Sequence, residues 1–137
     1  MLAGGVGSRF WPISSPSLPK QLLPLISHKP LLVDTLDRVS AIAPPERTLI
    51  LTNASLAEAV RDACPSVPRS NVIAEPKPAG TAAALTWAAA EIERRDASDA
   101  VMVCVHADWA IGNVDGFRKA LAGAADVAAK NHSLVTV

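Results

Sequence analysis

Ala100-Val101-Met102-Val103-Cys104-Val105 is an uninterrupted apolar run in a chain of 137 residues. Continuous apolar strands of this kind are typical of parallel sheets that are covered on both faces. On its N-terminal side, the alanine-rich segment Ala82 to Arg95 has the composition of a helix. On its C-terminal side, a helix capped by Asp115 is expected to run to about Lys130. The run therefore predicts a buried strand between two helices.

The alternation of strand and helix extends through the chain in both directions. Further strands are predicted at Met1 to Ala3, Thr48 to Thr52, Asn71 to Ala74 and Leu134 to Val137. Further helices are predicted from Leu31 to about Ala43, and from a capping box at Ser55 to Glu58 up to Cys64. This order predicts an α/β fold in which helices cover both faces of a mostly parallel sheet.

The composition excludes several classes of protein. Half of the residues are hydrophobic, and thirteen basic side chains balance thirteen acidic ones. A disordered chain and a basic, nucleic-acid-binding or membrane-anchoring surface are therefore not expected. No apolar run approaches the ~18 residues of a membrane span, and no secretion signal is recognisable. Cys64 and Cys104 lack a CxxC spacing and are interpreted as small buried thiols of a reduced, cytoplasmic protein.

Three loops that are far apart in the sequence each follow a predicted strand. They comprise residues 4–20, 75–81 and 106–113. Because ligands of parallel α/β sheets bind outside the carboxyl ends of the strands, these loops are expected to converge on one rim and to form a binding site there.

The first of these loops is rich in glycine. Gly4-Gly5-Val6-Gly7 can expose several backbone N–H groups to an anion, and Arg9 and Lys20 add positive charge nearby. Together they indicate a cradle for a polyphosphate. The loop lacks the Gly-Lys-Ser/Thr ending of a P-loop, and Phe10 replaces the third glycine of a dinucleotide fold. A tight connection without a ligand is the alternative interpretation.

Longer motifs around the glycine loop make its interpretation more specific. Leu2-Ala3-Gly4-Gly5-Val6-Gly7-Ser8-Arg9 is followed by Pro19-Lys20-Gln21-Leu22-Leu23-Pro24-Leu25. This pair of motifs resembles the sugar-1-phosphate nucleotidyltransferases. Glu75 to Leu85 resembles the base-recognition loop and following helix of that family, and Val105 to Ile111 resembles its metal-binding segment. The resemblance therefore covers the whole chain in the correct order.

Trp11 and Gln21 are most similar to the branch of the family that acts on mannose-1-phosphate. The resemblance implies transfer of a guanylyl group from GTP to mannose-1-phosphate, giving GDP-mannose and pyrophosphate, with Mg²⁺ as cofactor. It also implies a Rossmann-like fold of the glycosyltransferase-A type. Residues 1–137 would form its nucleotide-binding N-terminal part, incomplete at both ends. A homo-oligomer of the full-length protein is left open.

The same resemblance assigns roles to individual residues. Arg9 would lie beside the leaving pyrophosphate, Lys20 near the α-phosphate, and Asp108 would bind Mg²⁺. Nucleotide contacts are implied for Leu2, Ala3, Gly4, Gly5, Gly7, Ser8, Glu75, Gly80 and Thr81. Because the attacking phosphate oxygen is already anionic, this reaction requires positioning and charge neutralisation rather than a strong general base.

Each of these assignments has a simpler structural alternative. Arg9 and Lys20 would be solvated loop charges, Asp108 a turn cap, Glu75 a surface carboxylate, and Gly80-Thr81 merely the start of a helix.

The sequence also departs from the family pattern. His106 and Trp109 replace a proline and a histidine beside Asp108, which leaves the shape of that loop open. The first strand is short, and the segments that would hold the sugar phosphate and a second acidic metal ligand are expected to lie outside the chain. A nucleotide-binding module without turnover therefore remains an alternative function. Another sugar-1-phosphate, such as glucose-1-phosphate with a different nucleotide, is a further one.

Overall fold

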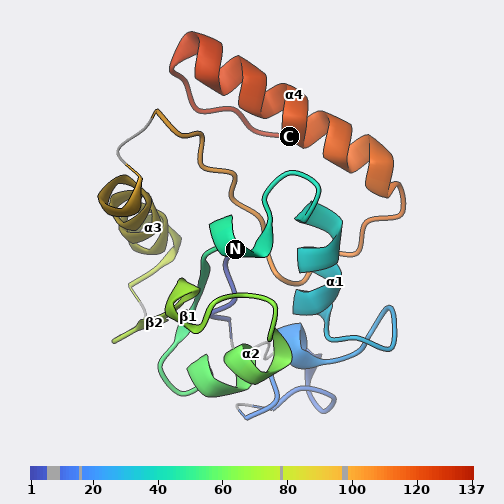
Figure 1. The fold of residues 1–137 in the computed structure, drawn as a ribbon. Coiled ribbons are helices and arrows are strands. Elements are labelled where there is room, and N and C mark those ends of the chain that lie inside the picture. The colour runs from blue at the N-terminus through green and yellow to red at the C-terminus, as the bar shows by residue number, and fades with distance from the viewer. Residues whose placement is uncertain (6–9, 16, 78, 97–98) are drawn as a thin grey trace.

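The computed structural model describes residues 1–5, 10–15, 17–77, 79–96 and 99–137 (Figure 1). Its helices are α1 (Leu31–Val39), α2 (Ala57–Ala63), α3 (Thr81–Arg95) and α4 (Val114–Asn131), and its strands are β1 (Ile50–Asn53) and β2 (Val72–Glu75). Short 3-10 turns occur at η2 (Lys20–Leu22), η3 (Pro45–Arg47) and η4 (Arg69–Asn71). None of the helices in these ranges is long and apolar enough to cross a membrane.

The backbone pairing is parallel, as expected. β1 and β2 pair in register from Ile50 with Val72 to Asn53 with Glu75. Leu2 extends this ladder through parallel bridges to Leu51 of β1 and to His106. The order across the sheet is therefore the segment at residue 106, the N-terminal segment, β1 and β2. The N-terminal segment has β1 and β2 on one side and residue 106 on the other, so the strand order reverses at this point.

Helices cover both faces of the sheet because the strand side chains alternate in direction. Ile50 packs with the buried residues Leu32 of α1, Val60 of α2 and Leu121 of α4. Leu51, the next residue, packs instead with the buried residues Ala84 and Ala88 of α3. Figure 1 shows α3 on the opposite side of the strands from α1. The expected α/β class, with helices on both faces, is thus confirmed.

The apolar run at residues 100–105 does not form the doubly buried strand that its composition predicts. Val105 is buried, but Val101 and Met102 are 41% and 37% exposed, and Cys104 is exposed as well. Leu2 donates its N–H to the Val105 carbonyl at 3.0 Å, so the neighbouring segment meets the end of the run and not its beginning. An apolar residue is buried only where another element covers it, and here this condition holds at the C-terminal end of the run.

Other predicted element boundaries also differ from those in the structure. The capping box at Ser55 is wrong: the Asn53 side-chain oxygen Oδ1 accepts from the Leu56 N–H at 3.0 Å, and Ser55 donates to the same oxygen at 2.8 Å. α4 is capped by Asn113, whose side chain accepts from the Gly116 N–H, rather than by Asp115. α1 ends at Val39, before the Pro44-Pro45 pair. Residues 134–137 form no strand, whereas α3 matches its predicted range closely.

Candidate functional site

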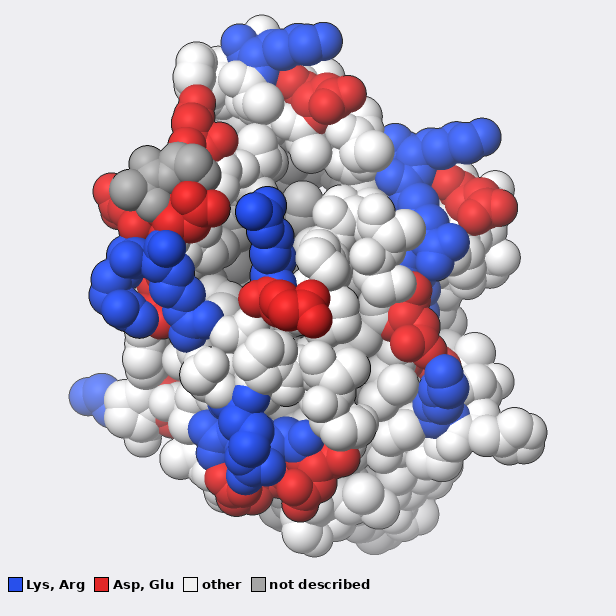
Figure 2. Space-filling model, in the orientation of Figure 1, with Lys and Arg blue, Asp and Glu red and all other residues white. Residues whose placement is uncertain are grey.

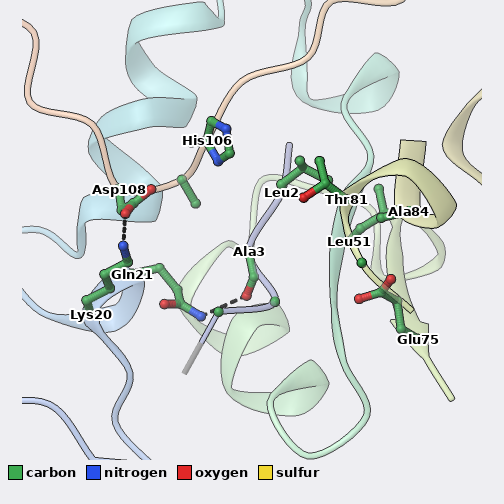
Figure 3. Close-up of a pocket in the computed structure, with 14 residues that line it drawn as sticks. Leu2, Ala3, Lys20, Gln21, Leu51, Glu75, Thr81, Ala84, His106 and Asp108 are labelled. Atoms are coloured by element: carbon green, nitrogen blue, oxygen red, sulfur yellow. Dashed lines mark hydrogen bonds and ion pairs between the residues drawn. The ribbon is translucent and has the colours of Figure 1, made fainter. Parts of the chain in front are cut away.

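A cavity of about 320 Å³ lies at the carboxyl ends of the paired segments (Figure 3). Its lining residues are Leu2, Ala3, Gly4, Gly5, Lys20, Gln21, Leu51, Glu75, Gly80, Thr81, Ala84, His106, Ala107 and Asp108. The cavity sits where the strand order reverses, which is the place where open α/β sheets bind their ligands. The described parts of the three loops singled out in the sequence therefore converge on one rim, as expected.

The predicted site residues in the described part of the chain are brought together in this cavity. Leu2, Ala3, Gly4, Gly5, Lys20, Glu75, Gly80, Thr81 and Asp108 all line it. Gly7, Ser8 and Arg9 lie outside the described residues. Their roles, and the roles of the residues that line the cavity, stay predictions. One cavity is thus shared by residues from four separate stretches of sequence.

Lys20 and Asp108 form an ion pair at one side of the cavity (Figure 3). Lys20 is the first residue of η2. Asp108 lies two residues after His106, which forms the parallel bridge with Leu2. The Lys20 and Asp108 side chains are 28% and 20% exposed, and the Lys20 ammonium also lies 5.7 Å from the centre of the Phe10 ring. Lys20 is therefore not a freely solvated loop charge. A cation and a carboxylate are held in contact beside the glycine loop.

This pair is set in a molecule of balanced charge. On the face drawn in Figure 2, basic and acidic side chains lie next to each other in separate groups among uncharged residues. The local charge of the cavity therefore comes from individual side chains rather than from a broad field of one sign.

The glycine loop is anchored at the residue that precedes it. The Ala3 carbonyl accepts hydrogen bonds from Gln21 Nε2 at 2.7 Å and from Thr52 Oγ1 at 3.1 Å. Both donors are buried, with Gln21 2% and Thr52 0% exposed. Two buried side chains thus fix the point at which the strand ends and the loop begins. The sequence predicts neither role: Gln21 belongs to the Pro19–Leu25 motif, and the only signal at Thr52 is its place at the end of a predicted strand.

Two glycines of the cavity differ in how strictly their positions require glycine. A Cβ on Gly4 would lie 3.3 Å from Glu75 Oε2, the end of a flexible side chain that would have to shift by a few tenths of an ångström. Gly80 has a φ of +87°, which other residues rarely adopt, and it directly precedes α3. The interpretation of Gly80-Thr81 as a helix start is therefore confirmed, and both residues line the cavity as well.

The loop around Asp108 contains His106 and Trp109, which the sequence resemblance identifies as expected departures. The rings of His106 and Trp109 stack with their centres 5.3 Å apart and their planes at 29°. His106 also pairs with Leu2 and lines the cavity. These two rings thus pack on each other, one from each side of Asp108 in the sequence.

The donor set at the cavity suits a divalent cation that is bound together with a substrate. Among the described ranges, no three His, Cys, Asp or Glu side chains gather closely enough to hold a metal ion by themselves. Mg²⁺ needs few protein ligands, because it keeps waters and binds phosphate oxygens of a substrate. The lining residues include two carboxylates, Glu75 and Asp108, and Asp108 lies beside Lys20. One carboxylate at this position fits this type of site.

Because the Lys20 ammonium occupies the Asp108 carboxylate, it would compete with a divalent cation for this group. If Asp108 holds Mg²⁺, replacing Lys20 by methionine is expected to raise the Mg²⁺ affinity of the chain in the absence of nucleotide. The expected gain is about fivefold, the equivalent of the ~1 kcal/mol that a partly exposed ion pair contributes at most. Calorimetric titration with MgCl₂ measures it. Lys29→Met, which removes the exposed Lys29–Asp37 pair, serves as the control and should change nothing. Unchanged Mg²⁺ affinity in Lys20→Met would show that the pair does not limit access to Asp108.

Comparison with known proteins gives one consistent family. The family model described as "Nucleotidyl transferase" matches residues 1–137. A mannose-1-phosphate guanylyltransferase of Sinorhizobium fredii is 36% identical over 140 residues, which cover 99% of this chain and 27% of the relative. One of Escherichia coli is 34% identical over 139 residues, covering 99% and 29%. The chain thus spans less than a third of the length of these curated relatives.

A solved structure supports the same match. The crystal structure described as a mannose-1-phosphate geranyltransferase from Thermus thermophilus superposes with a TM-score of 0.83 at 33% sequence identity. The match covers 93% of this chain and 36% of that one. The structural comparison and the sequence comparisons therefore identify similar relatives.

Proposed function

The chain belongs to the nucleotidyl transferase family, and on this premise we propose that it is the nucleotide-binding part of an enzyme that makes GDP-mannose. The reaction is the transfer of a guanylyl group from GTP to mannose-1-phosphate with release of pyrophosphate. The observation that carries this proposal is the Lys20–Asp108 pair beside Gly4 and Gly5 in a cavity at the reversal of strand order. The names of the 34–36% identical relatives supply the base and the sugar.

The triphosphate would lie along the glycine loop. Gly4 and Gly5 line the cavity and can turn their backbone N–H groups toward phosphate oxygens, and the buried bonds to the Ala3 carbonyl hold the start of this loop. Arg9, outside the described residues, is proposed beside the leaving pyrophosphate. Lys20 would move from Asp108 to the α-phosphate and stabilise the negative charge that develops there.

Asp108 is the residue proposed to hold Mg²⁺. When bound, the cation would neutralise phosphate charge and help to orient the triphosphate. Asp108 is available for this once Lys20 turns to the nucleotide, because its carboxylate is the partner of that ammonium in the structure. A sugar-phosphate oxygen is already anionic, so in-line attack on the α-phosphorus needs no proton acceptor from the chain.

The guanine base is proposed to bind at the other side of the cavity. Glu75, Gly80 and Thr81 lie there at the end of β2 and the start of α3, with Leu51 and Ala84 as apolar neighbours. Together with the Leu2-Ala3 backbone, these residues offer polar groups next to an apolar floor. Hydrogen bonds to base edges discriminate far better than an apolar pocket alone, which supports a role of this polar group in the choice of guanine.

Two measurements test the proposal. Pyrophosphate release is followed with GTP, mannose-1-phosphate and Mg²⁺, and thermal shifts are compared for GTP, UTP, dTTP and ATP. Stabilisation follows ligand affinity, so GTP should give the largest shift. GTP binding without turnover would assign nucleotide binding alone to these 137 residues. No preference for GTP would contradict the choice of base, and no binding of any nucleotide would contradict the site. The cytoplasmic location and the homo-oligomer stay predictions.

A further inference from the structure

A buried arginine outside the cavity contacts the loop that carries Asp108. Arg38 of α1 is 7% exposed, and its Nη2 donates to the Trp109 carbonyl at 3.0 Å. Trp109 directly follows Asp108, and 71 positions separate it from Arg38. Burial lowers the pKa of the Arg38 guanidinium, with the Asp34 charge acting in the opposite direction. A buried cation is costly unless it makes hydrogen bonds, so this contact is not an incidental one.

The same loop is fixed at its other end by the sheet. His106 pairs with Leu2, and Ala107 donates its N–H to the Leu2 carbonyl at 3.1 Å. The Trp109 ring stacks on His106. Asp108 therefore lies between a backbone ladder on one side and the Arg38 bond on the other. With both flanking residues held, its carboxylate is directed toward Lys20 and the cavity (Figure 3).

The neighbourhood of Arg38 shows where its donors are used. Asp34, one turn earlier on α1, has a buried oxygen, Oδ2, that has no hydrogen-bond partner among the described residues. Arg38 donates to the loop carbonyl although this carboxylate acts on it through space. Arg118 of α4 donates to the carbonyls of Arg38, at 2.8 Å, and Asp37, at 3.2 Å. These bonds hold the last turn of α1, from which Arg38 reaches the loop.

We propose that Arg38 is a positioning residue for Asp108, which fixes the 106–109 loop so that the carboxylate is oriented in advance for a divalent cation bound together with the nucleotide. This inference rests on the proposed function. It gives α1, which contributes no residue to the cavity lining, a part in metal binding.

The test measures the coupling between metal and nucleotide in the intact 137-residue chain. The dissociation constant of GTP is determined by calorimetry in EDTA and in saturating Mg²⁺. The readout is the value in EDTA divided by the value in Mg²⁺, which is larger than one when the metal strengthens binding. Arg38→Met keeps much of the aliphatic packing and removes the donors. We expect it to lower the ratio by about tenfold, the lower end of the loss seen when a group supporting a metal ligand is removed, and to leave binding in EDTA unchanged.

Arg61→Met is the matched control. It removes an arginine of α2 that also donates to backbone carbonyls, those of Arg69 at 3.4 Å and Val72 at 3.1 Å, and these partners lie outside the Asp108 loop. Both substitutions are expected to lower thermal stability, and the control should keep the wild-type ratio. Arg38→Gln, which is shorter and uncharged, replaces Arg38→Met if the methionine variant does not fold, and it should lower the ratio as well.

The outcomes separate this inference from the proposed function. If Asp108→Asn reduces the ratio to one while the folded Arg38 variants keep the wild-type value, the positioning role is overturned and the proposed function stands. An equal fall in Arg61→Met also overturns it, because the effect would then reflect a general loss of stability. A wild-type ratio of one, or an unchanged ratio in Asp108→Asn, overturns both the inference and the proposed metal site.

Discussion

Replacing Asp108 by asparagine is expected to weaken Mg²⁺-dependent GTP binding by roughly 100-fold, because the amide keeps the shape of the side chain and loses the charge that a hard cation requires. Binding in EDTA should change little, or rise slightly, since Lys20 loses its intramolecular partner and becomes free for phosphate. Calorimetric titration of GTP with and without Mg²⁺ gives both values. Turnover, where it is measurable, should fall with the metal-dependent affinity.

Asp62→Asn is the control for this substitution. Asp62 lies on α2, its side chain is 77% exposed, and it does not line the cavity. The same loss of one carboxylate charge should leave both GTP affinities within experimental error. If Asp62→Asn and Asp108→Asn reduced metal-dependent binding equally, the effect would come from net charge, and the assignment of Asp108 as the metal ligand would be wrong.

Leu32→Ala is expected to lower the free energy of unfolding by about 3–4 kcal/mol, within the range measured for buried leucines truncated to alanine. Leu32 is 0% exposed and joins α1 to the cluster that contains Ile50, Val60 and Leu121. Its removal leaves a cavity on the sheet face that α1, α2 and α4 share. Since domains of this size are stable by only ~5–15 kcal/mol, the loss is a large fraction of the total. Urea denaturation followed by circular dichroism measures it.

Leu134→Ala makes the same chemical change at a position that is 103% exposed. It should alter the free energy of unfolding by less than ~0.5 kcal/mol. A loss below ~1 kcal/mol in Leu32→Ala would show that this face of the sheet is not closely packed, because a leucine in a rigid core cannot be truncated at so small a cost.

The parts of the fold that were predictable are those with local causes. α3 follows from an alanine-rich segment whose helix preference needs no tertiary partner. The predicted cap at Ser55 was wrong because Asn53, at the end of β1, accepts the Leu56 N–H instead. This bond depends on the path of the chain as it leaves β1, which the spacing of residues in the sequence does not show. The run at residues 100–105 was predicted to be buried from its own composition. The burial of a segment depends on which other elements cover it, and its own composition does not determine those elements.

The site shows the same division. Lys20 and Asp108 could be placed on one rim because the carboxyl ends of parallel strands lie together. Their direct pairing could not be predicted, because it depends on the path of the loop that carries η2. The bond from Thr52 to the Ala3 carbonyl depends on the register of β1 beside the N-terminal segment. Arg38 looks in the sequence like one more charge on a helix, and only the packing of α1 shows that it is buried.

The position of Leu2 between Leu51 and His106 bears on how the molecule folds. Its two neighbours arrive about fifty and about a hundred residues later in the chain, so both contacts close long loops and carry the entropic cost of doing so. During synthesis, residues near position 2 leave the ribosome before either partner and wait for the second one until the segment at His106 has emerged. The junction between Leu2 and the described start of the glycine loop would therefore gain its final shape only after about a hundred further residues have been made.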